Sequence, residues 1–266
     1  METKLFTDQL GRSVTVNFPP KRIVSLVPSQ TEFLYDLGLD SEIVGQTLFC
    51  IHPKSKHKTK TIIGGTKNLK LDIIAQLKPD LIIGNKEENE QKQIEYLMHH
   101  FPVWMSDIYT LEDSFKMMES LGQLVYKTLE ANQIVNQIKL SFSDLKLFDN
   151  PNNKVAYFIW RNPYMVAANH TFINHLLQKL NFSNVFANHL DRYPQITNED
   201  LVVANPDFIF LSSEPYPFKE KHIAELQQLL PKAKILLVDG EMFSWYGSRL
   251  LHSVRYFGQL QAQLSN

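Results

Sequence analysis

The apolar and polar positions of this chain follow one arrangement twice. Residues 71–84 contain a short amphipathic run, the turn Lys-Pro-Asp and a continuous apolar run. Residues 198–211 repeat that order around the turn Asn-Pro-Asp. Helical periodicity followed by a short apolar run predicts a helix and then a strand buried on both faces. The aspartates of the two turns, Asp80 and Asp207, lie 207 − 80 = 127 residues apart. That offset is almost half of the chain, so the pattern predicts two α/β lobes of similar plan.

The first 50 residues contain further pieces of the same plan. Residues 12–16 alternate in polarity and predict an opening edge strand, and residues 22–27 form an apolar run typical of a buried strand. Pro28 opens a predicted helix that Gly38 ends, and residues 42–45 predict another short strand. Strands that alternate with helices indicate a parallel sheet covered by helices.

The middle of the chain predicts helices alone. Thr110 and Asp113 have the spacing of a capping box, and a second cap at Thr128 opens a helix expected over 128–147. A helix of about 20 residues is about 30 Å long and forms a stiff connector. A polar stretch at 149–153 ends it. We therefore expect a Rossmann-like α/β lobe at 1–110, a helical connector at 111–149 and a second Rossmann-like lobe at 150–266, with a ligand cleft between the lobes.

Composition narrows the class of protein. The chain is 44% hydrophobic with a formal net charge of −1, which gives no general attraction to nucleic acid or anionic membranes. Its single cysteine excludes an internal disulfide bond. The polar N-terminus lacks the apolar core of a signal peptide. The protein is therefore expected either to stay in the cytoplasm or to have lost a leader.

Several quoted segments together resemble a known family. These are Arg22-Ile-Val-Ser-Leu26, Pro28-Ser-Gln-Thr-Glu32, Gly64-Gly-Thr66 and Leu77-Lys-Pro-Asp-Leu-Ile82, with the connecting helix. In order and spacing the chain resembles, over residues 5–260, the helical-backbone (class III) periplasmic substrate-binding proteins of ABC importers. The cobalamin-binding branch is the most similar, and the siderophore and haem branches share its fold.

The resemblance implies a monomer that binds cobalamin or another metal chelate and delivers it to an ABC permease and ATPase. It implies a periplasmic or cell-envelope location, no cofactor, no nucleic-acid partner and no enzymatic activity. It also implies that one carboxylate on each lobe docks onto permease arginines. The matching positions are Glu90 and Glu199, each at an expected helix start where the dipole favours a carboxylate. An ordinary solvated helix-start acid is the alternative at both.

Candidate ligand contacts follow the expected strands, because ligands bind at the carboxyl ends of parallel strands. Aromatic rings there suit a planar macrocycle, and arginines suit carboxylate or phosphate groups. A core position is the alternative for each aromatic ring. The candidates are Phe49, His52, Asn85, Trp160, Arg161, Tyr164, Phe243, Trp245, Tyr246 and Arg249.

Metal and catalytic chemistry receive little support from the residues. Cys50 and His52 could hold a metal-centred ligand axially, but two residues are too few for a structural zinc site. We expect Cys50 to be a buried thiol, and His170, His175 and His189 to be surface or capping residues. Glycine-rich nucleotide loops and nucleophile elbows are absent from the sequence.

Two alternative functions remain open at this point. One is a cytoplasmic carrier or sensor that keeps the receptor fold without a permease. The other is an enzyme acting on a tetrapyrrole or metal complex, with Asp239, Glu241, His52 and Cys50 as its acid–base groups.

Overall fold

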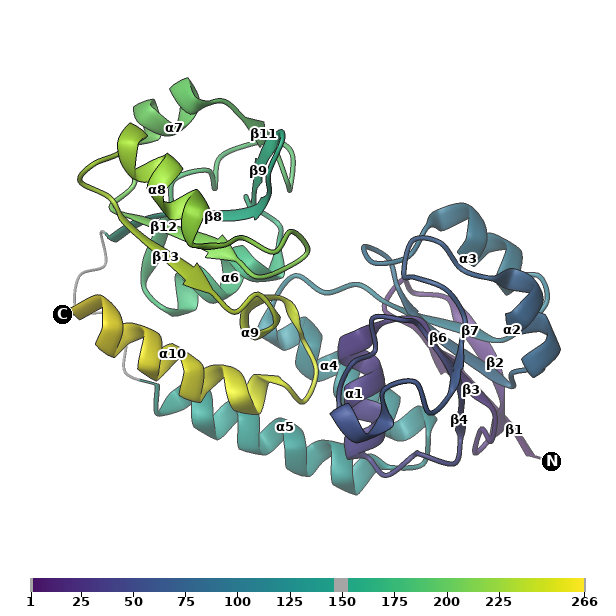
Figure 1. Cartoon of the computed structure of the whole chain (residues 1–266). Coiled ribbons are helices and arrows are strands. Elements are labelled where there is room, and N and C mark those ends of the chain that lie inside the picture. Colours follow the sequence, from purple (N-terminus) through teal and green to yellow (C-terminus); the bar gives the residue numbers. More distant parts are fainter. Residues whose placement is uncertain (1, 146–152, 266) are drawn as a thin grey trace. The chain divides into compact units, whose positions relative to one another are not determined.

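The computed structural model describes residues 2–145 and 153–265, and their helices and strands appear in Figure 1. The first part of the chain contains β1 (Glu2–Thr7), β2 (Ser13–Phe18), β3 (Ile23–Ser25), α1 (Pro28–Asp36), β4 (Ile43–Gln46), the short 3-10 helix η1 (Lys54–Lys56), β5 (Thr61–Ile62), α2 (Leu71–Leu77), β6 (Leu81–Asn85), α3 (Gln91–Met98) and β7 (Val103–Ser106). Helices α4 (Leu111–Leu124) and α5 (Thr128–Ser143) follow.

The later part of the chain returns to alternating strands and helices. It contains β8 (Asn153–Trp160), β9 (Tyr164–Val166), α6 (Phe172–Lys179), β10 (Phe182–Asn184), β11 (Gln195–Ile196), α7 (Asn198–Ala204), β12 (Phe208–Ser212), α8 (Glu220–Leu229), β13 (Lys234–Val238), α9 (Glu241–Ser244) and α10 (Leu250–Ser265). The predicted α/β class is confirmed. The predicted ligand cleft between the lobes stays a prediction.

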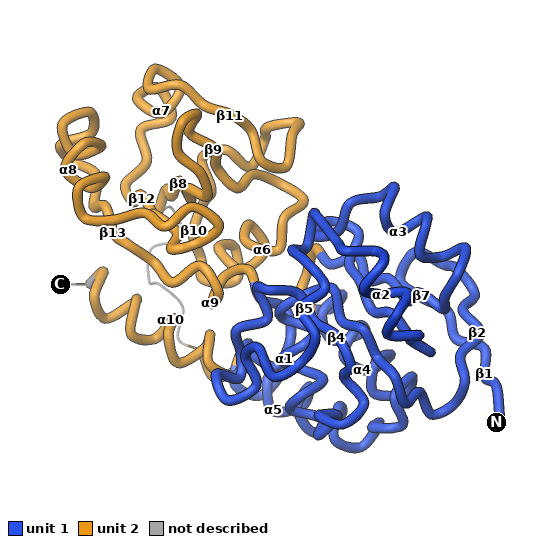
Figure 2. The backbone as a smooth tube through the Cα atoms, turned by 45° about the vertical axis from the view of Figure 1, so that its right-hand side comes forward, with its two compact units in different colours: residues 1–108, 112–141, 245–251 blue, residues 109–111, 142–244, 252–266 orange. Residues whose placement is uncertain are grey.

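The chain divides into two compact units (Figure 2). Unit 1 comprises residues 1–108, 112–141 and 245–251, and unit 2 comprises residues 109–111, 142–244 and 252–266. The sequence-based division placed Trp245–Leu251 in the second lobe. In the structure this segment belongs to unit 1, so the chain enters unit 1 after α9 and leaves it within the first residues of α10.

The main sheet of unit 1 is parallel, in the order β5-β4-β3-β6-β7. Its central strand β3 is fully buried, as its apolar sequence predicts, and Ile23 stands opposite Leu81 of β6. Helix α1 starts with Pro28, whose fixed backbone angle suits a first helical position. The helix ends before Gly38, which has a φ of 79° that glycine adopts without steric cost.

The predicted edge strand at 12–16 corresponds to β2, but it does not extend the main sheet. It pairs antiparallel with β1 in a separate two-stranded sheet, and the sequence analysis had not predicted β1. The turn between them explains the pairing. The Asp8 carboxylate accepts hydrogen bonds from the backbone N–H groups of Leu10 and Arg12, at 3.0 and 2.9 Å, and Gly11 has a φ of 76°.

The sheet of unit 2 is mixed rather than parallel throughout. Its order is β11-β9-β8-β12-β13, and β10 also pairs with β8. The β8, β12 and β13 strands run parallel, whereas β9 runs antiparallel to β8 and β11 antiparallel to β9. The core beside it includes Phe158, Leu201, Ile209 and Leu211, all without exposed surface.

The sequence repeat is visible in the backbone. Helices α2 and α7 are seven residues long, and each ends at a residue in the left-handed conformation, Lys78 with φ 45° and Asn205 with φ 43°. A proline and an aspartate follow, and then the five-residue strand β6 or β12. The helix–turn–strand unit that the hydrophobic pattern predicts is thus formed in both units.

The two repeat aspartates hold the start of the neighbouring strand. The Asp80 carboxylate accepts hydrogen bonds from the N–H groups of Lys21 and Arg22, both at 2.8 Å. The Asp207 carboxylate accepts one from the N–H of Lys154, at 2.9 Å. These bonds satisfy N–H groups just before β3 and at the second residue of β8.

The helix predicted over 128–147 begins at Thr128 and ends at Ser143, so it has 16 residues instead of about 20. Ser143 and Asp144 are residue types that compete with helical hydrogen bonds, which accounts for the earlier end. Residues 146 and 147 of the predicted helix, and residues 149–152 of the predicted polar stretch, lie outside the described residues. The chain passes from unit 1 to unit 2 between residues 141 and 142, within this helix.

Candidate functional site

The loop after β4 exposes large apolar side chains. Leu48, Phe49 and Ile51 are 45%, 51% and 38% exposed although they lie within four consecutive positions. The Leu48 N–H donates to the carbonyl of Gly64 at 2.9 Å, and a Cβ added to Gly65 would lie 3.2 Å from the Phe49 ring. The loop therefore has ordered contacts that hold apolar side chains in solvent, an arrangement that marks binding surfaces.

Cys50, in the same loop, points inward. It is 1% exposed, and its Sγ lies 3.1 Å from Oγ1 of Thr31 and 3.2 Å from Oγ1 of Thr47. Burial raises the pKa of the Cys50 thiol above its ordinary value. The structure agrees with the expectation of a buried thiol, and the neutral S–H form suits this site better than a metal-binding thiolate.

His52 lies beside Trp245, and both belong to unit 1. Their rings meet edge to face, with centroids 5.4 Å apart and planes at 78°. Trp245 is 7% exposed, and the guanidinium carbon of Arg249 lies 4.9 Å from the centroid of its ring. Among the predicted contacts, the fold thus brings His52, Trp245 and Arg249 together across almost 200 residues of sequence.

Arg249 pairs with a carboxylate of the protein itself. Its Nε and one terminal nitrogen donate to the two oxygens of Glu32, at 2.8 and 2.5 Å. Both residues are 7% exposed. Burial raises the pKa of the Glu32 carboxyl, and the hydrogen bonds and charge of Arg249 oppose that shift. Sequence reasoning had not singled out Glu32 as a partner, and nothing in its local pattern indicates one.

Asn85 and Phe243 have packing roles in the structure. The Asn85 amide donates to Oγ of Ser106 at 2.9 Å and accepts from the N–H groups of Glu87 and Glu88, at 2.8 and 3.0 Å. Phe243 has no exposed surface and lies in the aromatic core of unit 2, with its ring centroid 5.1 Å from that of Tyr157. Each was predicted as a ligand contact because it stands at or after the end of a strand. In the structure, both side chains contact other residues of the protein.

In unit 2 the exposed aromatic surface lies at the ends of β8 and β12. Trp160 is the last residue of β8 and is 41% exposed. Its ring meets that of Tyr216 edge to face, with centroids 5.7 Å apart. Tyr216 was missed by sequence reasoning, although it follows the second repeat strand by four residues and this position could have indicated it.

The two other predicted contacts of unit 2 near β8 have partners within the unit. Arg161 donates to the Glu225 carboxylate at 2.8 Å. Tyr164 is half-buried and packs edge-on against Phe158, with ring centroids 5.3 Å apart. Both follow Trp160 closely in the sequence.

Tyr246 and the remaining histidines do not form a metal centre. Tyr246 is 5% exposed, and its carbonyl accepts a hydrogen bond from Ser114 at 2.6 Å. Among the described residues, groups of three or more histidine, cysteine, aspartate or glutamate side chains close enough to hold a metal ion are absent. His170 and His189 are exposed, and His175 is half-buried.

The two predicted docking acids differ in their surroundings. Glu199 is exposed in the first turn of α7, and within the described residues its carboxylate has no hydrogen-bond or ion-pair partner. Glu90 is half-buried and caps α3, because its carboxylate accepts a hydrogen bond from the Gln93 N–H at 2.9 Å. The Glu199 carboxylate is therefore accessible to a partner, whereas the Glu90 carboxylate already stabilises the start of α3.

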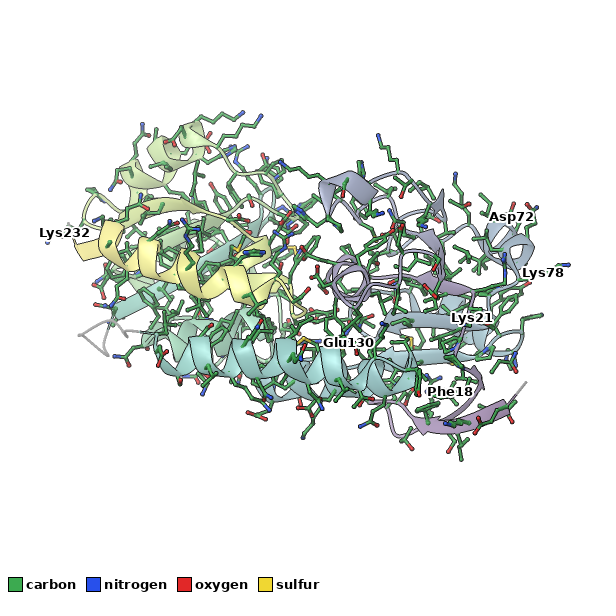
Figure 3. The ribbon with its side chains drawn as sticks, turned by 90° about the horizontal axis from the view of Figure 1, so that it is seen from below. Phe18, Lys21, Asp72, Lys78, Glu130 and Lys232 are labelled. Atoms are coloured by element: carbon green, nitrogen blue, oxygen red, sulfur yellow. The ribbon has the colours of Figure 1, made fainter. Side chains whose placement is uncertain are left out.

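The repeat identifies another acid in unit 1. Subtracting 127 from 199 gives 72, and Asp72 is the second residue of α2, as Glu199 is of α7. Asp72 is exposed, and Figure 3 labels it on the helix that leads to Lys78. The sequence contained this signal, since the same offset relates the two Pro-Asp turns.

Comparison with known proteins places the chain in a family. Residues 23–231 match the model of the periplasmic binding protein family. A vitamin B12-binding protein of Vibrio parahaemolyticus is 28% identical over 199 residues, which are 74% of this chain and 72% of that protein. An uncharacterized ABC transporter substrate-binding lipoprotein of Bacillus subtilis is also 28% identical, over 76% of this chain and 67% of that protein.

Solved structures show the same fold. The periplasmic vitamin B12 binding protein of Vibrio cholerae matches with a TM-score of 0.76 at 20% identity, covering 94% of this chain and 100% of that one. The periplasmic haem-binding protein of Vibrio cholerae also matches with a TM-score of 0.76, at 18% identity over 92% of this chain and 99% of that one. Within residues 2–145 and 153–265, no helix is long and apolar enough to cross a membrane. The match over most of its length shows that this chain belongs to the periplasmic binding protein family.

Proposed function

We propose that this protein is the substrate-binding component of an ABC importer and that it captures a corrinoid or another metal chelate at the cell envelope. The observation that carries the proposal is the exposed apolar surface, with an aromatic ring in it, that follows a strand in each unit. In unit 1 this is the wall formed by Leu48, Phe49 and Ile51, and in unit 2 it is formed by Trp160 with Tyr216.

The chemistry of these walls suits a bulky macrocycle. Flat apolar rings pack against a conjugated or corrin-like ring without requiring many matched hydrogen bonds. An ordered loop that already holds Phe49 in solvent loses little side-chain freedom when a ligand binds. The vitamin B12-binding and haem-binding names among the relatives support a ligand of this class. Those relatives are binding proteins, and the absence of an enzymatic activity remains part of the proposal.

The ligand class is tested by colour. The protein is incubated with cobalamin, haem or a ferric siderophore, desalted and examined by absorbance, and the retained ligand is titrated by calorimetry. Retained cobalamin supports the corrinoid proposal, and retained haem or siderophore keeps the receptor and replaces the ligand. Retention of none contradicts the proposed function and favours a carrier or enzyme with a different substrate.

Two substitutions locate the ligand. Phe49→Ala and Trp160→Ala should each weaken binding by about tenfold to a hundredfold, as truncation of an aromatic anchor does. Leu129→Ala and Leu190→Ala are matched controls, because these side chains are 77% and 98% exposed outside the proposed walls. If the wall variants and the control variants change the affinity equally, the ligand binds elsewhere on the protein.

The importer contact is proposed at exposed carboxylates. Glu199 and Asp72 occupy the same position in the repeated helix, and both carboxylates are exposed. Such a pair suits two permease arginines, since charge-assisted hydrogen bonds to arginine are strong and directional. Glu90 is the alternative in unit 1 that the sequence analysis proposed.

A further inference from the structure

The segment Trp245–Leu251 is fixed to unit 1 by contacts along its length. The Tyr246 carbonyl accepts from Ser114, and the Ser248 hydroxyl donates to the Asp36 carboxylate. Gly247 packs so closely on α1 that an added Cβ would lie 2.5 Å from the carbonyl oxygen of Ser29. The segment reaches unit 1 from the far end of the sequence and has little room to shift against α1.

Arg249, in this segment, forms a buried ion pair with Glu32. Two hydrogen bonds of 2.8 and 2.5 Å join them, and each residue is only 7% exposed. Removing charges from water is costly, and an apolar pair of similar volume is often as stable or more stable. A contribution to folding stability is therefore a weak explanation for the presence of this ion pair. Its distinctive property is geometry, because a planar guanidinium held by two bonds has one orientation.

The fixed guanidinium leads to the proposed ligand wall through two ring contacts. Its carbon lies 4.9 Å from the Trp245 ring centroid, and the Trp245 ring meets His52 edge-on at 5.4 Å. His52 belongs to the loop that exposes Phe49 and Ile51. The order of contacts is therefore Glu32, Arg249, Trp245, His52 and then the exposed loop, all within unit 1.

We propose that Glu32 and Arg249 are positioning residues, which set the orientation of Trp245 and, through it, of His52, the residue next to the ligand wall of unit 1. This inference rests on the proposed function. It changes the role of Arg249 from a predicted ligand contact to a support behind the wall. The ligand affinity then depends on an ion pair that has no need to touch the ligand.

The test compares three variants by calorimetry with whichever of cobalamin, haem or ferric siderophore the intact protein retains. Glu32→Gln keeps the shape and removes the charge, and Arg249→Lys keeps the charge and removes the planar fork. Each should weaken binding by about tenfold, equivalent to about 1.4 kcal/mol. The double variant Glu32→Met with Arg249→Leu should recover the unfolding stability lost in the single variants, because an apolar contact replaces the ion pair. Its affinity should stay low, because the orienting bonds are gone.

A second readout follows Trp245 without ligand. The chain has three tryptophans, so Trp104→Phe and Trp160→Phe leave Trp245 as the only indole emitter. Glu32→Gln in that background should shift its emission and alter its near-ultraviolet circular dichroism. Asp8→Asn is the matched control, because Asp8 is 5% exposed and also forms an ion pair in unit 1, with Arg12, and its carboxylate otherwise accepts from backbone N–H groups outside the Trp245 segment. It should lower stability without changing the Trp245 spectrum or the affinity.

The outcomes separate this inference from the proposed function. Unchanged affinity in the single variants, or recovery of affinity together with stability in the double variant, would overturn the positioning role and leave the receptor intact. An unchanged Trp245 spectrum in Glu32→Gln would also overturn it. Failure of the intact protein to retain any of the three ligands would contradict the proposed function itself, and the inference would fall with it.

Discussion

The two units share a helix–turn–strand scaffold, but their proposed ligand walls are built in different ways. Around α2 and α7 the chain repeats one helix, one left-handed residue, one Pro-Asp and one strand. The wall of unit 2 combines residues from two strands, since Trp160 ends β8 and Tyr216 follows β12. The wall of unit 1 instead lies on one loop, and the next residue of that loop, His52, packs against Trp245, almost 200 residues away in sequence. The repeat thus keeps the helix, the left-handed residue and the strand, whereas the proposed ligand wall of each unit is formed by different elements.

The largest expected effect concerns the proposed docking acids, Asp72 and Glu199, which occupy the same position in the two copies of the repeat. The double variant Asp72→Lys and Glu199→Lys should abolish ligand uptake by the importer while leaving calorimetric affinity unchanged. Each lost charge-assisted hydrogen bond is worth about 1.5–3 kcal/mol. Glu112→Lys is the matched control, because Glu112 is an exposed acid in the first turn of α4.

Glu90→Lys distinguishes the two candidates in unit 1. It should cost about 1 kcal/mol of stability through loss of the α3 cap, with uptake retained. If Glu90→Lys stops uptake and Asp72→Lys does not, the docking acid of unit 1 is Glu90, as the family resemblance implies, and the position within the repeat does not identify it.

The next effect compares the repeat aspartates. Asp80 accepts two backbone hydrogen bonds and Asp207 accepts one. Asp80→Ala should therefore destabilise unit 1 by about 2 kcal/mol, and Asp207→Ala should destabilise unit 2 by about 1 kcal/mol. Urea unfolding followed by unit-specific hydrogen exchange measures both. Equal losses would mean that the second bond to Asp80 contributes nothing.

A smaller effect compares the left-handed residues. Lys78→Gly should stabilise unit 1 by up to about 1 kcal/mol, because a lysine side chain crowds the backbone in this conformation. Asn205→Gly should be close to neutral, because asparagine tolerates it. Thermal unfolding of both variants tests the difference, and a destabilised Lys78→Gly would show that the Lys78 side chain makes a compensating contact.

The smallest effect is a pH dependence that unit 2 has and unit 1 lacks at the matching position. His222 is 1% exposed, and its Nδ1 accepts a hydrogen bond from the Lys219 N–H at 2.8 Å. Burial lowers the pKa of His222, and the positive charges of Arg161, Lys221 and Lys219 act in the same direction against the opposing charge of Glu225. The residue 127 positions earlier is Glu95, which is exposed.

The sign of this dependence follows from the lowered pKa. The folded protein binds fewer protons at His222 than the unfolded chain, so the stability contribution is present above about pH 6.5 and is lost as the pH falls through the lower folded pKa. Between about pH 8 and about pH 5, unit 2 should lose more unfolding free energy in the intact protein than in His222→Asn. Identical slopes in the two proteins would assign the pH dependence to other groups.

Much of the scaffold could be predicted from local pattern. The buried strands β3 and β6, the helix between Pro28 and Gly38 and the two repeat turns follow from periodicity and from residues with fixed backbone preferences. Strand β1 was missed, because its partner is selected by the Asp8 turn rather than by its own pattern. Position after a strand selected the exposed Trp160 and, equally, the buried Phe243.

The sequence alone determined the α/β class, the internal repeat and the family resemblance, because these depend on near neighbours in the chain. Only the tertiary structure decided that Arg249 binds Glu32 across 217 residues and that Trp245 belongs with His52. A guanidinium pairs with whichever carboxylate the fold brings within hydrogen-bonding distance, and burial then makes that choice costly to break. Local sequence records the residue's chemistry, and the packing of distant segments selects its partner.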